Sequence, residues 1–254
     1  MPSLKVFFFI HLDLLNYSAM TSKEVLSELK KLGKESIKKV LINHGAKEPF
    51  YGVAVGDLKT IVKKVKVNHE LALELYDSGI SDAMYLAGLI ADDLKMTKKD
   101  LNKWADQAYW YMISEYTVPW VASGSPFGHE LSLEWMESKK ENVAAAGWCT
   151  YANLISRIPN EKLDLLEIES LLIRIEKEIH KAPNRVRSTM NLFVICVGGY
   201  VKPLSEKAIG LAKKIGKVSV HMGNTACKVP YAPEYIEKMK ARGSLEKKKK
   251  AVKC

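Results

Sequence analysis

Hydrophobic residues recur at intervals of three and four along most of this sequence, which is the spacing of one face of an α-helix. Within residues 22–33, Val25, Leu29 and Leu32 share a face, and a glycine follows where the helix would end. Strand-like alternation occurs only over residues 218–222, a stretch too short to seed a sheet. The pattern predicts an all-α protein.

Helix start signals recur at intervals of roughly 15 to 20 residues along the chain. The candidate N-caps are Thr21, Asn68, Ser81, Thr97 and Ser138, three of them followed by an acid at the spacing of a capping box. Paired helices at a period of roughly 40 residues predict a HEAT-like, armadillo-type superhelical solenoid of antiparallel pairs over residues 20–242. A solenoid of this kind offers an extended concave surface, which suits a long partner.

The two ends of the chain differ from this pattern. Residues 1–19 form an apolar leader interrupted by His11 and Asp13, and we interpret it as a disordered segment or an over-long start before Met20. No run approaches the ~20 apolar residues of a membrane span. Residues 243–254 form a basic C-terminal tail.

The net charge of +10 is concentrated near the C-terminus, because residues 238–254 carry eight basic residues against one acid. Only +3 is left on the rest of the chain, so the total says little about the body of the protein. The tail is either a solvated end or a phosphate-binding arm.

The cysteines predict neither a zinc site nor a disulfide framework. Cys149, Cys196, Cys227 and Cys254 lie far apart and form no pair at metal-ligand spacing. We therefore expect no metal and no cofactor, and a monomer in the reducing cytoplasm.

All five tryptophans lie between Trp104 and Trp148. Large aromatic residues dominate protein cores, so most of these rings are expected to pack in the interior. The alternative is a ring-lined cleft that stacks on a nucleobase. The candidate cleft aromatics are Tyr116, Trp120, Trp148 and Tyr151.

Glu115 lies in the most unusual local sequence, four residues before Pro119 and among aromatic residues. The proline must end or kink a helix there. A carboxyl group beside rings can have a raised pKa and serve as a general acid or base. The alternative is an ordinary helix charge or ion-pair partner.

Arg185 and Arg187 stand out because the chain has only five arginines beside 34 lysines. They occupy a predicted helix start, where guanidinium groups and backbone donors suit an anion. Further candidate phosphate ligands are Lys228, in a glycine-containing loop, and Lys59 and Lys63 on an earlier helix.

With these segments in place, residues 22–215 resemble the AlkD-type DNA alkylation repair family, HEAT-like proteins that include glycosylases for N-alkylated purines. The resemblance is carried by Asn43-His44, the stretches at residues 51–59 and 81–92, and Ala146-Gly-Trp148. Three further segments, at residues 117–120, 184–187 and 225–230, look like those of a branch without a demonstrated activity.

The chain departs from the family where the catalytic residues should stand. The resemblance places Pro119 at the catalytic Asp and Glu115 at the first wall tryptophan, while the cleft arginine falls near Tyr151 and the second tryptophan near Ile195. Glu115 lies one helical turn from the lost Asp and is the candidate replacement.

These observations favour a protein that binds double-stranded DNA, damaged or branched, through its phosphates. Lysine excess suits backbone contacts, whereas base reading relies on arginine. A diverged glycosylase for alkylated purines, a non-catalytic binder of branched or damaged DNA and a helical scaffold for another protein all remain open.

Overall fold

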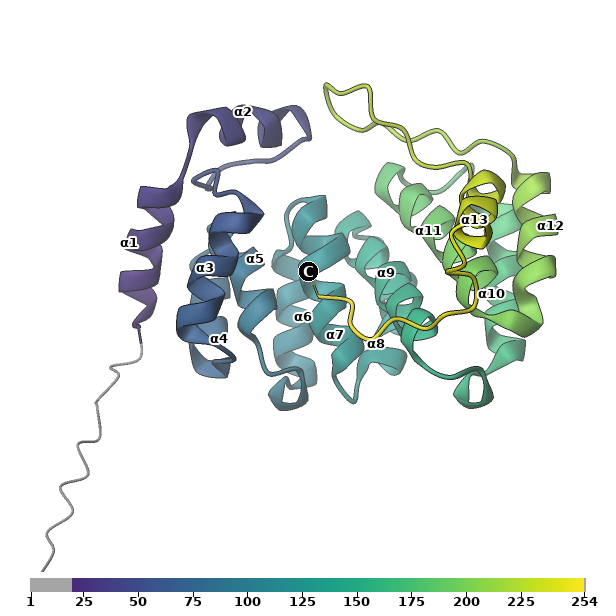
Figure 1. Cartoon of the computed structure of the whole chain (residues 1–254), viewed down its shortest axis with the longest axis horizontal. Coiled ribbons are helices and arrows are strands. Elements are labelled where there is room, and N and C mark those ends of the chain that lie inside the picture. The colour runs from purple at the N-terminus through teal and green to yellow at the C-terminus, as the bar shows by residue number, and fades with distance from the viewer. Residues whose placement is uncertain (1–19, 254) are drawn as a thin grey trace, which may run out of the picture.

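The computed structural model describes residues 20–253, so the leader interpretation of residues 1–19 lies outside the part that it covers. Within residues 20–253 there are thirteen α-helices and no strand, which confirms the all-α prediction. The helices stack side by side in an arc that runs from α1 at one end to α12 at the other (Figure 1).

The α-helices are α1 (Ser22–Leu32), α2 (Glu35–Asn43), α3 (Val55–Val65), α4 (His69–Asp77), α5 (Ser81–Ile90), α6 (Lys98–Gln107), α7 (Val118–Gly124), α8 (Gly128–Met136), α9 (Glu141–Arg157), α10 (Leu165–Glu178), α11 (Asn184–Tyr200), α12 (Ser205–Ile215) and α13 (Ala232–Ala241). Three short 3-10 helices are η1 (Asp93–Lys95), η3 (Asn160–Lys162) and η4 (Lys202–Leu204). A π-helical turn, η2 (Ile113–Thr117), precedes α7.

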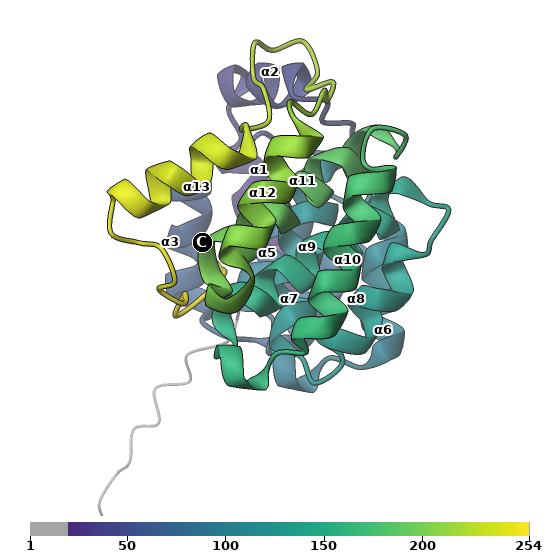
Figure 2. The ribbon, with the colours of Figure 1, turned by 90° about the vertical axis from the view of Figure 1, so that its right-hand side faces the viewer.

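A central row of helices forms the core. Helix α5 contacts η2 and α7, α7 contacts α9, and α9 contacts α11. Nearly every residue of α5 is buried, and α9 and α11 are buried over most of their length. Helices α8, α10 and α12 pack beside this row and are amphipathic or partly exposed (Figure 2).

Helix α8 packs closely against α9 of this row, and the contact depends on a glycine. A Cβ atom at Gly147 would lie 2.7 Å from both the Met136 amide nitrogen and the Ser132 carbonyl oxygen. The absence of a side chain therefore allows the two backbones to approach directly.

The capping predictions have mixed outcomes. Thr21 and Thr97 form complete capping boxes, and the Asn68 side chain accepts from the Leu71 amide, as predicted. Ser81 was expected to cap α5 but is its first residue, and its hydroxyl accepts from the Trp110 indole 2.7 Å away. Ser138 does not cap α9, because the helix begins at Glu141 and the serine accepts from the Lys140 amide instead.

The basic C-terminal segment lies across the body of the protein (Figure 1). The Glu246 amide donates to the Gly199 carbonyl (2.6 Å), and the Lys249 amide donates to the Ser156 carbonyl (2.8 Å). The Lys253 ammonium lies 3.1 Å from the Ala91 carbonyl oxygen and 2.6 Å from Asp93 Oδ1. The segment thus meets, in order, the C-terminal ends of α11, α9 and α5.

Candidate nucleic-acid interface

The position of Glu115 follows from the π-turn that precedes α7. Pro119 has no N–H and its ring would crowd the carbonyl of the residue four positions earlier, which is Glu115. Residues 113–117 relieve this conflict by widening into a π-turn, in which the Val118 amide donates to the Ile113 carbonyl. The predicted break at Pro119 is therefore a change of helix type.

Glu115 and Arg185 form an ion pair with two parallel hydrogen bonds. Arg185 Nε lies 2.6 Å from Glu115 Oε1, and Arg185 Nη2 lies 2.6 Å from Oε2. The carboxylate side chain is 7% exposed and the guanidinium side chain 18%. Two residues singled out separately in the sequence thus become one charge-neutral unit.

Other groups hold Arg185 in this orientation. Its guanidinium lies over the Tyr111 ring, 4.5 Å from the centroid, and Nη1 is 3.2 Å from the Met222 sulfur. Its backbone amide donates to Glu141 Oε1 over 2.6 Å. Glu141 therefore connects the first turns of α9 and α11.

Burial controls the ionisation of this region. Burial raises the pKa of Glu115, although the hydrogen bonds and charge of Arg185 act in the opposite direction. Burial also raises the pKa of Tyr116 to about 12, and the negative charge of Glu115 adds to that shift. The phenol is thus a neutral hydroxyl at physiological pH.

Of the four candidate cleft aromatics, only Tyr116 is exposed, at 42%. Its ring meets Tyr111 and Trp120 edge-on, at centroid distances of 6.4 and 6.0 Å. Trp120 is 4% exposed and packs against Tyr85. Tyr116 is therefore the ring of this group that a base could reach.

Trp148 and Tyr151 lie inside the protein. Trp148 is fully buried and packs edge-on against Phe193. Tyr151 is 3% exposed, and its hydroxyl donates to a carboxylate oxygen of Glu167. Both rings act as core residues in this conformation.

Arg187 differs from Arg185 in having no carboxylate partner among the described residues. Its Nη2 lies 3.3 Å from the side-chain oxygen of Asn184, and its buried Nε has no acceptor within residues 20–253. The guanidinium thus keeps unused donors for an anion.

Asn184 also fixes the loop that follows α12, at residues 217–231. Its amide donates to the His221 carbonyl over 2.9 Å and its oxygen accepts from the His221 amide over 2.7 Å. Farther along, the Asn224 amide donates to the Asn43 carbonyl (2.7 Å), and Gly223 packs directly on Asn43. The loop therefore joins the first turn of α11 to the end of α2.

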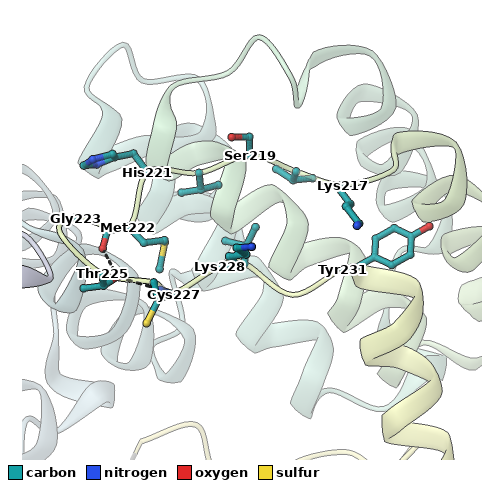
Figure 3. Close-up of a pocket in the computed structure, with 13 residues that line it drawn as sticks. Lys217, Ser219, His221, Met222, Gly223, Thr225, Cys227, Lys228 and Tyr231 are labelled. Atoms are coloured by element: carbon teal, nitrogen blue, oxygen red, sulfur yellow. Dashed lines mark hydrogen bonds between the residues drawn. The ribbon is translucent and has the colours of Figure 1, made fainter.

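Within this loop, Lys217, Lys228 and Tyr231 line a cavity of about 540 Å³ (Figure 3). Hydrogen bonds from the Thr225 hydroxyl to the Met222 carbonyl and from the Cys227 amide to the Thr225 hydroxyl shape the tip. The loop thus presents cationic side chains from a defined backbone.

The remaining candidate cations are free. Lys228, Lys59 and Lys63 are exposed, and none has an acidic partner among residues 20–253. Their ammonium groups carry uncompensated charge, as phosphate ligands must.

Sequence reasoning missed three residues of this region. The sequence pattern places Glu141 in a capping box and Asn184 at a helix start, and it gives Asn43 only a family resemblance. Their partners lie 37 or more positions away along the chain, so no local pattern could have identified their contacts.

Residues 20–253 contain no group of three His, Cys, Asp or Glu side chains placed to hold a metal ion. No helix in that range is long and apolar enough to cross a membrane.

Comparison with protein families gives a match to the model for "DNA alkylation repair enzyme" over residues 25–236. Two uncharacterized proteins, one from Listeria innocua and one from Listeria monocytogenes, are each 35% identical over 229 residues, covering 88% of this chain and 99% of each relative.

A solved structure is 41% identical to the chain and superposes with a TM-score of 0.85, covering 92% of this chain and all of its own. It is described as belonging to a new family of proteins related to the HEAT-like repeat DNA glycosylases, with affinity for branched DNA structures. The HEAT-like architecture expected from the sequence is thereby confirmed.

Proposed function

Since the chain belongs to the DNA alkylation repair enzyme family, as its sequence resemblance predicted, we propose that it binds branched DNA through the phosphate backbone without excising alkylated bases. The similar solved structure supports branched DNA as the ligand, because its description names affinity for branched DNA structures. Identity of 41% over nearly the whole chain supports a shared binding mode.

The observation that carries this proposal is the paired state of Glu115. A carboxylate that stabilises a developing sugar cation must direct uncompensated negative charge at it. Both oxygens of Glu115 instead accept hydrogen bonds from Arg185, and its charge is balanced within 2.6 Å. The candidate replacement for the family's catalytic acid is therefore committed to a structural pair.

The phosphate contacts are assigned to the unpaired cations. Arg187 offers a guanidinium beside the first turn of α11, and Lys228 extends from the loop above it. Lys59 and Lys63 on α3 add sequence-independent attraction along the backbone. Tyr116 is the exposed ring for a base at a distorted or unpaired position.

Fluorescence anisotropy with a four-way junction and a linear duplex of equal length tests the binding. We expect tighter binding to the junction than to the duplex. A plot of the logarithm of the binding constant against the logarithm of the salt concentration should fall with a slope of about 0.9 for each phosphate neutralised. Equal affinity for both, or no binding at low ionic strength, would contradict the proposal and favour a protein partner for the arc.

Single-turnover release of 7-methylguanine from methylated DNA tests the absence of excision. We expect release at the spontaneous rate by the wild-type protein and by Glu115→Gln. Release above that rate, lost in Glu115→Gln, would instead make Glu115 a catalytic residue.

We further propose that the protein acts as a monomer in the cytoplasm. Cys149, Cys196 and Cys227 carry free thiols, and Cys227 is exposed, which suits a reducing compartment. Mass photometry should give a single species near 28.5 kDa.

A further inference from the structure

Glu141 has no cationic side chain as a partner among residues 20–253. It is the first residue of α9, and its Oε1 accepts the hydrogen bond from the Arg185 backbone amide over 2.6 Å. The cations nearest to it in these contacts are engaged elsewhere, since Lys140 pairs with Asp106 and the Arg185 side chain pairs with Glu115. Glu141 therefore brings a negative charge without a cationic partner to an interface assigned to phosphates.

Helix α11 uses this carboxylate because its own sequence supplies no cap. Pro183 precedes the helix and has no side-chain oxygen, and the first turn contains no acid. The unpaired N–H groups and the dipole of such a helix end attract anions. Glu141 reaches this end from α9, which it also begins, so one carboxylate serves the N-termini of two helices. It thus takes a donor that a phosphate would otherwise use.

The charge of Glu141 also acts on the neighbouring ion pair. Burial is the main cause that raises the pKa of Glu115, and the negative charge of Glu141 acts in the same direction. Two carboxylates and one guanidinium therefore meet here, and their net charge is negative. Arg187, whose buried Nε has no acceptor among residues 20–253, follows Arg185 within the same helical turn. A phosphate held at Arg187 therefore lies near an opposing charge.

We propose that Glu141 is a specificity-determining residue, which closes the N-terminus of α11 to single small anions and repels phosphates held nearby. A free phosphate gains little from one exposed cation in water, so it depends on the helix end that Glu141 occupies. A DNA backbone overcomes the repulsion because it reaches several cations at once. Glu141 thus discriminates by repulsion between a polyanion and inorganic phosphate. The DNA half of this inference rests on the function proposed above, and the small-anion half does not.

Thermal unfolding of the full chain in phosphate and in chloride, at equal ionic strength and millimolar concentration, tests the small-anion half without DNA. Wild-type protein and Glu141→Gln should melt at the same temperature in both salts, because glutamate and glutamine both accept from the Arg185 amide. Glu141→Ala frees that amide, so its melting temperature should be higher in phosphate than in chloride. Equal melting temperatures of Glu141→Ala in the two salts would overturn the exclusion of small anions.

Fluorescence anisotropy with the four-way junction tests the repulsion. Glu141→Gln keeps the hydrogen bond to the Arg185 amide and removes the charge. It should therefore tighten junction binding roughly three- to tenfold and steepen the salt dependence by up to about one phosphate. A purely structural role of Glu141 predicts unchanged or weaker binding in this variant, and either result would overturn the repulsion.

Glu206→Gln is the matched control. Glu206 lies in the first turn of α12, is exposed, and forms no ion pair with residues 20–253. This variant should bind the junction as wild-type protein does and melt equally in both salts. The inference fails if Glu141→Gln and Glu206→Gln bind the junction alike and Glu141→Ala does not respond to phosphate. Absence of junction binding in every variant contradicts the proposed function instead, and the comparison of the two salts still decides whether Glu141 excludes small anions.

Discussion

The first turn of α11 and the segment at residues 244–253 are both basic, but their charges have different partners. In the segment, Lys248 and Lys253 donate to backbone carbonyls of Ile155 and Ala91. Near the first turn of α11, Arg187 has no acidic partner among residues 20–253, and Lys228 is exposed. The segment with the most lysines in the sequence is therefore one in which some of the ammonium groups already bind backbone carbonyls of the protein itself.

The physical cause of this difference is which ends of α5, α9 and α11, three helices of the central row, face each basic region. Unpaired carbonyls at helix C-termini attract cations, and unpaired N–H groups at N-termini attract anions. The ends of α5, α9 and α11 that face residues 244–253 are C-terminal. A lysine-rich segment is thus complementary to one edge of the arc, while a phosphate is complementary to the other.

The largest expected effect comes from breaking the one paired arginine near the α11 N-terminus. Glu115→Ala should lower the free energy of unfolding by about 3–5 kcal/mol, because it leaves the guanidinium of Arg185 buried without its partner. Urea unfolding measures this. Lys103→Ala, which removes an exposed pair with Asp77, is the control and should change stability little. Equal effects of the two variants would refute the structural assignment of Glu115.

The next effect concerns the unpaired arginine. Arg187→Ala should weaken junction binding roughly ten- to a hundredfold, since a charge-assisted contact to phosphate is lost, and should lower the salt slope by about one. Arg242→Ala removes an exposed arginine just after α13 and serves as the control. The assignment fails if both variants bind alike.

Truncation after Gly243 contrasts the two basic regions directly. Loss of the contacts made by residues 244–253 should reduce stability by roughly 1–3 kcal/mol, measured by thermal unfolding. If these contacts are the segment's role, the salt dependence of DNA binding should stay near that of the full chain. A clearly shallower salt slope with unchanged stability would make the segment a phosphate-binding arm instead.

The smallest effect is expected at the loop tip. Gly223 has φ of +72° and lies directly against Asn43, so Gly223→Ala should separate the loop from α2. Limited proteolysis should then cut residues 217–229 faster, with little change in global unfolding. Gly210→Ala, where a Cβ meets nothing within 4 Å, is the control.

Local signals predicted the helices well because helix starts depend on neighbours in sequence. Asn68 and the Thr97 capping box behave as their spacing implies. Ser81 and Ser138 do not. The Ser81 hydroxyl accepts a hydrogen bond from the distant Trp110 indole, and α9 begins at Glu141, three residues after Ser138. Residue type alone cannot show which tertiary partner competes for a side chain.

The candidate site was predictable only as separate parts. Scarce arginine and an acid among aromatics drew attention to Arg185 and Glu115, but their pairing spans 70 positions. Burial was the other missing quantity. Trp148 and Tyr151 carry the composition of a stacking site, yet neighbouring helices enclose both rings.

The contact between Asn224 and Asn43 has a mechanical consequence for the arc. In a helical solenoid each repeat touches mainly its neighbours, so small rotations accumulate along the stack and the whole bends like a spring. The hydrogen bond from the loop after α12 to the end of α2 links two distant parts of the arc directly and so limits this bending. A second link of this kind is the ion pair between Lys253, in the segment that follows α13, and Asp93. A partner that needs a wider arc must release at least one of these ties, so its apparent affinity will include the work of stretching the protein.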